Sequence, residues 1–214
     1  MFETTNVRSD GVGPQQVINE NFEASDYKVL DWIKDIFPDS QAAQKDLEDT
    51  LTDNPGRISR AYRALLGGYL THPKDVIKVT LEIPEQDFTG LISSIQVPFL
   101  SFCSHHFLPY FGTVDIVYEP GPYIIGIGKM PRLVECRARR FELQETLVKH
   151  LCEDMMNYAK AKGVFVRSVA RHTCVCYRGA KMYSTANQTM HTMGTLSGPA
   201  RMPEIMGLLT ATNM

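Results

Sequence analysis

The chain has 214 residues, of which 43% are hydrophobic and 21% charged, and its formal net charge is −2. This composition is ample for a packed core and excludes global disorder, and the length suits one domain or a domain with an added helical region. The near-neutral charge argues against nucleic acid or an anionic membrane as a partner, and no stretch is long and apolar enough to span a bilayer.

The first part of the chain predicts a tail followed by helices. Residues 1–23 contain glycine and proline and show little periodicity, so we expect a flexible N-terminal tail. Residues 24–73 predict a helical region of three helices, punctuated by proline and glycine. We expect Ser25 or Asp26 to cap the first helix, which ends at Pro38.

The other two helices of this region also have recognisable ends. The second is expected over residues 40–51, with Asp39 or Ser40 as its cap. The third is expected to begin at residues 54–55, where asparagine precedes proline, and to stop at the glycine pair 67–68.

From residue 74 onward the sequence favours β-strands together with one long helix, so residues 74–214 are expected to form the main domain. An apolar stripe at helical spacing predicts a long helix over residues 141–162. The sequence therefore predicts an α+β body, although the last forty residues fit no clear element. Residues that favour β-structure predict strands over 76–81, 88–102, 111–118, 123–128, 164–169 and 172–177.

The N-terminal residues and the cysteines indicate where the protein is located and whether its thiols are reduced. Residues 1–16 lack the apolar core of a secretory signal, so we expect a cytoplasmic protein. An odd number of cysteines without such a signal favours reduced thiols or metal ligands over a disulfide framework. We interpret Cys136 and Cys152 as small buried hydrophobic residues.

The other three cysteines lie with histidines in two short segments, 103–106 and 172–176. Cys103 and His106 stand three residues apart, a common spacing for two ligands from one turn. His172, Cys174 and Cys176 alternate, so in a strand they would share one face. Thiolate and imidazole ligands together suit zinc.

The spacing leaves the number of ligands open. If Cys103, His106, Cys174 and Cys176 all bind, the metal is enclosed and structural; if only three bind, water can take the fourth position and the site is catalytic. In the catalytic case His105 and His172 lie beside the metal as proton donors or acceptors.

The same segments resemble a known family. Residues 103–109, Cys-Ser-His-His-Phe-Leu-Pro, resemble the Cys-x-His-His-x-x-Pro signature of GTP cyclohydrolase I, and residues 172–179 resemble its second signature, His-x-Cys followed by Arg-Gly. Residues 126–132 resemble its phosphate-binding segment, 139–145 its Arg-Arg-x-x-x-Gln-Glu helix start, and 54–62 its Thr-Pro-x-Arg stretch.

This resemblance implies a fold and a reaction. The family fold is the tunnelling fold, in which antiparallel sheets and packed helices of several subunits close into a barrel, usually a homodecamer. Its zinc enzymes attack C8 of GTP with water, open the imidazole ring, release formate and form 7,8-dihydroneopterin triphosphate on the way to tetrahydrofolate.

The resemblance also implies roles for single residues. Cys103, His106 and Cys174 would hold zinc, and His105 and His172 would transfer protons. The substrate contacts would be Glu145 and Gln144 for guanine and Lys129, Arg132 and Arg178 for the triphosphate. Arg57 would be supplied to the triphosphate by a neighbouring subunit.

Two departures from the family pattern keep alternatives open. The residue after the first cysteine is Ser104 instead of glutamate, and Gly128 replaces a serine assigned to the later sugar rearrangement. One alternative is a paralogue that stops at a ring-opened intermediate or uses another guanine nucleotide. A second is a non-catalytic scaffold whose zinc is enclosed by Cys176.

Overall fold

The computed structural model of the chain describes residues 21–78, 81–82 and 88–210. The chain divides into two compact units, one ending at Ala64 and the other beginning at Leu65. The expected tail falls almost entirely outside the described residues, as do residues 79–80 of the strand expected over 76–81. Among the described helices, none combines the length and apolar character needed to cross a bilayer.

The first unit contains two of the three expected helices, α1 (Asn21–Ile36) and α2 (Gln41–Asp53), and all but the last residue of the third, α3 (Arg57–Leu65). Ser40 caps α2 as predicted, because its hydroxyl accepts a hydrogen bond of 3.3 Å from the backbone N–H of Ala43. This bond satisfies one of the N–H groups that have no partner within the helix.

One of the two expected caps of α1, Asp26, has a different role. It lies inside α1 and is 1% exposed, and its carboxylate accepts backbone bonds of 3.0 Å from Ile58 and 2.8 Å from Ser59. Asp26 therefore caps α3, where its negative charge also complements the positive end of the helix dipole. A cap supplied from more than thirty residues away leaves no local signature in the sequence.

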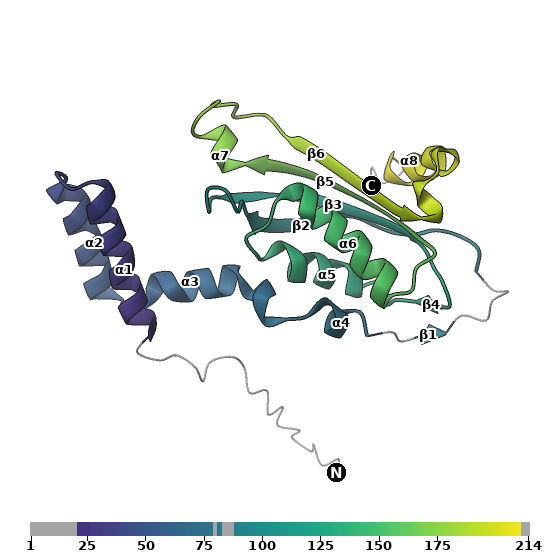
Figure 1. Ribbon diagram of the computed structural model, residues 1–214, viewed down its shortest axis with the longest axis horizontal. Helices are drawn as coiled ribbons and strands as arrows, with labels where there is room; N and C mark the ends of the chain where they lie inside the picture. Colours follow the sequence, from purple (N-terminus) through teal and green to yellow (C-terminus); the bar gives the residue numbers. More distant parts are fainter. Residues whose placement is uncertain (1–20, 79–80, 83–87, 211–214) are drawn as a thin grey trace, which may run out of the picture. The chain divides into compact units, whose positions relative to one another are not determined.

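The second unit is built on a four-stranded antiparallel sheet (Figure 1). Its strands, in spatial order, are β2 (Ile92–Phe102), β3 (Pro109–Glu119), β5 (Gly163–His172) and β6 (Asn187–Gly194). A separate short ladder joins β1 (Leu81–Glu82) to β4 (Tyr123–Ile124). The α+β class is thus confirmed.

Helices cover one face of this sheet and part of the other (Figure 1). The helices α5 (Lys129–Ala138) and α6 (Gln144–Tyr158) pack against alternate strand residues such as Ile116 and Val166 to form the main core. Their neighbours Val117 and Phe165 point to the opposite face, as strand geometry requires, and pack against α8 (Met202–Thr210). Short helices of this unit also include η2 (Gly67–Leu70), α4 (Pro73–Val76), η3 (Thr195–Ser197) and η4 (Pro199–Arg201).

Three predictions for this unit were wrong in part. The strand expected over 123–128 is only the two residues of β4, and it leads into α5, which was not predicted. Val76 ends the short helix α4 instead of starting a strand. Residues 173–176 form the one-turn helix α7 instead of a strand. The strand β3 begins at Pro109, and its pairing with β5 ends at Tyr110 and His172, so β3 does not continue as a partner for residues 173–176.

A buried ion pair joins the two helices that cover the sheet. Arg137 of α5 binds both carboxylate oxygens of Asp154 of α6, at 2.5 and 2.6 Å, and the Asp154 side chain is 3% exposed. We expect Asp154→Ala to lower the free energy of unfolding by about 3–5 kcal/mol, because it leaves the Arg137 charge partly buried without its partner.

The adjacent position supplies the control for this prediction in urea or thermal unfolding. Glu153 pairs with Lys149 at the surface, with side-chain exposures of 36% and 58%. We expect Glu153→Ala to change stability by less than about 0.5 kcal/mol. Equal effects of the two substitutions would show that the buried pair adds no stability.

Candidate metal centre and active site

The turn between β2 and β3 brings the first two candidate ligands together. Cys103 donates its backbone N–H to Leu108 at 2.9 Å and accepts bonds from His106 at 3.3 Å and Phe107 at 2.8 Å. Phe107 adopts a φ of 56°, in the left-handed region, which allows the chain to turn back tightly. As a result the Cys103 Sγ lies 3.7 Å from the Nδ1 of His106.

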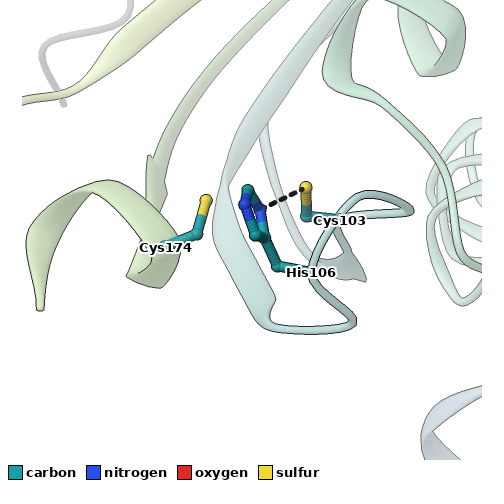
Figure 2. Close-up of side chains that lie close together, drawn as sticks. All are labelled: Cys103, His106 and Cys174. Carbon is teal, nitrogen blue, oxygen red and sulfur yellow. Dashed lines mark hydrogen bonds between the residues drawn. The ribbon is translucent and has the colours of Figure 1, made fainter. Parts of the chain in front are cut away.

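The third candidate ligand, Cys174, lies about seventy residues further along the sequence. Tyr110 at the start of β3 pairs with His172 at the end of β5, so α7 (Thr173–Cys176) begins next to the turn. The Thr173 hydroxyl fastens this end by donating a 2.7 Å hydrogen bond to the carbonyl of Pro109. Figure 2 shows the side chain of Cys174 directed from α7 toward the two side chains of the turn.

The three ligand atoms of Cys103, His106 and Cys174 all lie within 4.8 Å of one another (Figure 2). With Zn–S and Zn–N bonds of about 2.3 and 2.0 Å, two ligands of a tetrahedral zinc lie about 3.5–3.8 Å apart. The arrangement therefore needs only small side-chain movements to fit a zinc ion.

The surroundings of Cys174 affect its ionisation. Burial raises the pKa of Cys174, and the neighbouring Cys103 thiol raises it further. A divalent cation between the two sulfurs would stabilise both thiolates and reverse this effect, since thiolate is the form that binds metal.

The fourth candidate ligand lies apart. Cys176 is 2% exposed and is not a member of the ligand group found among the described residues. The prediction that it shares a strand face with Cys174 was wrong, because both residues lie in the helical turn of α7. Two residues correspond to about 200° around a helix, so the two side chains diverge.

His172 is held from two sides at the end of β5. Its Nε2 lies 2.9 Å from the Oε1 of Gln144, and its ring stacks on the Tyr110 ring at a centroid distance of 4.4 Å and an interplanar angle of 3°. Burial lowers the pKa of His172, and the nearby Glu145 carboxylate opposes that shift. A histidine with a lowered pKa stays neutral at a pH where it can accept a proton.

The remaining residues expected near the metal differ in exposure. His105 is exposed on the turn, with its ring centroid 6.2 Å from that of His106. Glu145 is exposed in the first turn of α6 and lies close enough to His172 to influence its charge. Gln144, which was expected to line the guanine pocket, is 2% exposed, and its amide nitrogen donates to Ser168 and Asn187.

Two of the residues expected to hold phosphate, Lys129 and Arg132, lie away from this centre. The backbone N–H of Ile125 donates to the hydroxyl of Tyr118, which lies at the opposite end of β3 from Tyr110. Lys129 follows shortly after Ile125 as the first residue of α5. Eight strand residues separate these tyrosines by about 26 Å. Arg132 lines a cavity beside η2 that none of the three metal-group residues borders.

The other two expected phosphate contacts come from different regions. Arg178 is exposed just after α7, and Arg57 is the first residue of α3 in the other compact unit. Of the described substrate residues, only Glu145 and Gln144 are in contact with, or electrostatically close to, His172.

Sequence reasoning missed Tyr110. It is fully buried and is the one aromatic ring that contacts His172 among the ring contacts of the described residues. The only available signal was its place directly before a predicted strand, seven residues after Cys103. Its partner became known only with the register of β3 and β5.

The chain is similar in sequence to GTP cyclohydrolase I proteins. A family model described as GTP cyclohydrolase I matches residues 33–209. The GTP cyclohydrolase 1 proteins of Campylobacter lari and Clostridium kluyveri are 37% and 32% identical to this chain, over 68% and 67% of its length and 75% and 76% of theirs. That of Bifidobacterium longum is 35% identical over 74% of this chain and 79% of its own.

A likeness to solved structures is weaker. The apo form of the archaeosine synthase QueF-Like matches 50% of this chain and 97% of its own, with 15% identity and a TM-score of 0.40. At that level of similarity it carries no argument about this chain.

Proposed function

The chain belongs to the GTP cyclohydrolase I family, and from this premise we propose that it uses zinc to open the imidazole ring of GTP at C8, releasing formate and forming 7,8-dihydroneopterin triphosphate. The observation that carries the proposal is the convergence of Cys103, His106 and Cys174 within 4.8 Å beside a histidine held in place. Three ligands leave one tetrahedral position for solvent.

Zinc, when bound by these three residues, supplies a Lewis acid that lowers the pKa of water to near neutrality. The protein supplies the rest of the chemistry. His172 and His105 exchange protons with the attacking water and with the imidazole nitrogen that leaves when the ring opens. Glu145 is exposed at the start of α6, where its carboxylate can accept hydrogen bonds from N1–H and the 2-amino group of guanine.

The distribution of the basic residues supports a site shared between subunits. Lys129 lies toward the far end of β3 from the metal group, so a single chain does not bring its own Lys129 to a nucleotide bound there. We propose that Lys129, Arg132 and Arg57 act on the site of a neighbouring copy, and Arg178 on its own. The strands β2 and β6, which are the edge strands of the sheet that the described residues form, would join between copies into the tunnelling-fold barrel, with a homodecamer as the expected assembly.

The scaffold alternative receives no support from Cys176. It was proposed as the fourth ligand that would enclose the metal, but its side chain is not part of the ligand group among the described residues. The truncated-reaction alternative has a specific observation in its favour, which is the missing side chain at position 128.

Gly128 is the residue before α5, and α5 has no side-chain cap there. Its φ of −67° suits any residue, and nothing lies within 4 Å of the place where a Cβ would stand. A serine therefore fits without strain, and its hydroxyl could cap the helix. The glycine removes a hydroxyl that the later sugar rearrangement would use, while the metal group is untouched.

The test is to incubate the zinc-loaded protein with GTP and to follow formate and pterin fluorescence separately. Equal rates of formate and fluorescent pterin support the complete reaction, whereas formate without pterin supports a ring-opened product. If the truncated reaction holds, Gly128→Ser should raise the ratio of pterin to formate and the matched Gly128→Ala should not. A panel of guanine nucleotides examines the alternative substrates, and absence of formate from all of them would refute the proposed function.

A further inference from the structure

We propose that Gln144 and Tyr110 are positioning residues that hold His172 with its proton on Nε2, so that Nδ1 is the nitrogen that exchanges protons with the substrate. The role in proton exchange rests on the proposed function. The geometry of the two contacts stands independently of it.

The first step is the orientation of the Gln144 side-chain amide. Its nitrogen lies 3.1 Å from the carbonyl oxygen of Ser168, 3.2 Å from the Ser168 hydroxyl and 3.1 Å from the carbonyl oxygen of Asn187. Backbone carbonyls only accept hydrogen bonds, so the group facing them must be the NH₂. The opposite orientation would place an amide oxygen against two carbonyl oxygens in a buried site, at the cost of unpaired acceptors.

The second step follows for His172. Since the NH₂ of Gln144 faces β5 and β6, its Oε1 faces the imidazole at 2.9 Å from Nε2. An amide oxygen cannot donate, so Nε2 must carry the hydrogen. A neutral His172 then has its lone pair on Nδ1, and the bond made by one ring nitrogen thus decides what the other can do.

The third step concerns the plane of the ring. Tyr110 is fully buried and lies parallel to the imidazole at 4.4 Å, which blocks rotation of the His172 ring toward that side. The tyrosine hydroxyl lies beside the Ser101 side chain, whereas the imidazole of His172 is hydrogen-bonded to Gln144. The ring face, and not the hydroxyl, is therefore the part of Tyr110 that acts on His172.

These contacts tie His172 to several elements at once. Gln144 begins α6, Ser168 lies on β5, Asn187 begins β6 and Tyr110 lies on β3. The orientation of the imidazole is therefore set by the packed sheet and helix, and not by the exposed turn that carries His105.

The direct test measures the proton position in the zinc-loaded full chain without substrate. Histidine nitrogens labelled with ¹⁵N are observed by magic-angle-spinning NMR, and His172 is assigned by the signals missing from His172→Gln. We expect a protonated Nε2 and a bare Nδ1 for the neutral ring. A proton on Nδ1 with a bare Nε2 would overturn the inference, whatever the activity of the protein.

Kinetics with GTP separate positioning from substrate binding. Gln144→Leu should lower kcat by about 10²- to 10⁴-fold, the range of a lost acid–base contribution, with KM changed by less than about threefold. Ser168→Ala is the matched control, because it removes one acceptor from the same NH₂ and leaves both carbonyls; we expect less than about a threefold change in kcat. A rise in KM at constant kcat in Gln144→Leu would instead indicate a guanine contact and contradict the positioning role.

The stacked ring is tested in the same assay. Tyr110→Leu should lower kcat by about tenfold or more, because small misplacements of a reacting group are costly, and Tyr110→Phe should recover most of that loss. Unchanged kcat in Tyr110→Leu, with zinc content retained, would remove Tyr110 from the inference. If the unaltered protein releases no formate from GTP, the proposed function fails, and the NMR result alone decides the position of the proton.

Discussion

Replacement of Cys174 by alanine is expected to strip the protein of zinc and to abolish formate release from GTP. Among the described residues, Cys174 supplies one of the three ligand atoms that converge within 4.8 Å. Loss of a residue that merely supports a ligand costs about 10- to 100-fold in metal affinity or activity, and loss of a ligand itself should exceed that. Zinc per chain, measured by elemental analysis after dialysis, is the primary measurement, with formate release in parallel.

The control for this prediction lies two residues away. Cys176 belongs to the same helical turn and is buried, whereas Cys174 is partly exposed, and Cys176 is outside the ligand group. Cys176→Ala should retain one zinc per chain and most of the activity. Loss of zinc from this variant, with retention in Cys174→Ala, would reverse the assignment and revive an enclosed, structural metal.

The metal group was largely predictable from sequence because its information is local. Cys103 and His106 lie on one turn, three residues apart, so their proximity follows from the local sequence and does not depend on the rest of the fold. Cys174 was predictable as a ligand although its secondary structure was not. Whether the residues after β5 form a strand or a one-turn helix, Cys174 lies just beyond the end of β5. This places it next to the turn that precedes β3.

The support around His172 was not predictable because it depends on register. Tyr110 meets His172 only because β3 and β5 pair at that position, and a shift of one residue would place the ring on the other face. Gln144 was expected to contact substrate, since nothing in a helix start reveals that two strands will present carbonyl oxygens to its side chain.

The same limit applies to Asp26 in the first unit. Its position before an apolar run predicts a local cap, yet its carboxylate is used by α3, thirty-two and thirty-three residues further along. Sequence patterns identify which residues can cap, bind metal or transfer protons. They do not identify the partner when that partner is brought close by tertiary packing.

Replacement of His172 by alanine is the second substitution for which we expect a large effect. The residue is proposed to exchange protons during ring opening, and loss of such a group lowers kcat by about 10²- to 10⁴-fold, or about 2.7–5.5 kcal/mol of transition-state stabilisation. Zinc should remain, because His172 is not in the ligand group and the three ligand atoms come from Cys103, His106 and Cys174. Single-turnover formate release and zinc content, measured on the same sample, give the two values.

A second variant at this position separates proton transfer from packing. Glutamine can place an amide N–H where the Nε2–H of His172 meets the Oε1 of Gln144, but it cannot take up or release a proton near neutral pH. His172→Gln should therefore keep zinc and thermal stability close to those of the unaltered protein and still lose as much kcat as His172→Ala. Activity retained in His172→Gln would mean that His172 acts through its hydrogen bond alone, and zinc lost from both variants would make it part of the metal's support; in either case proton transfer would fall to His105, the other histidine beside the metal.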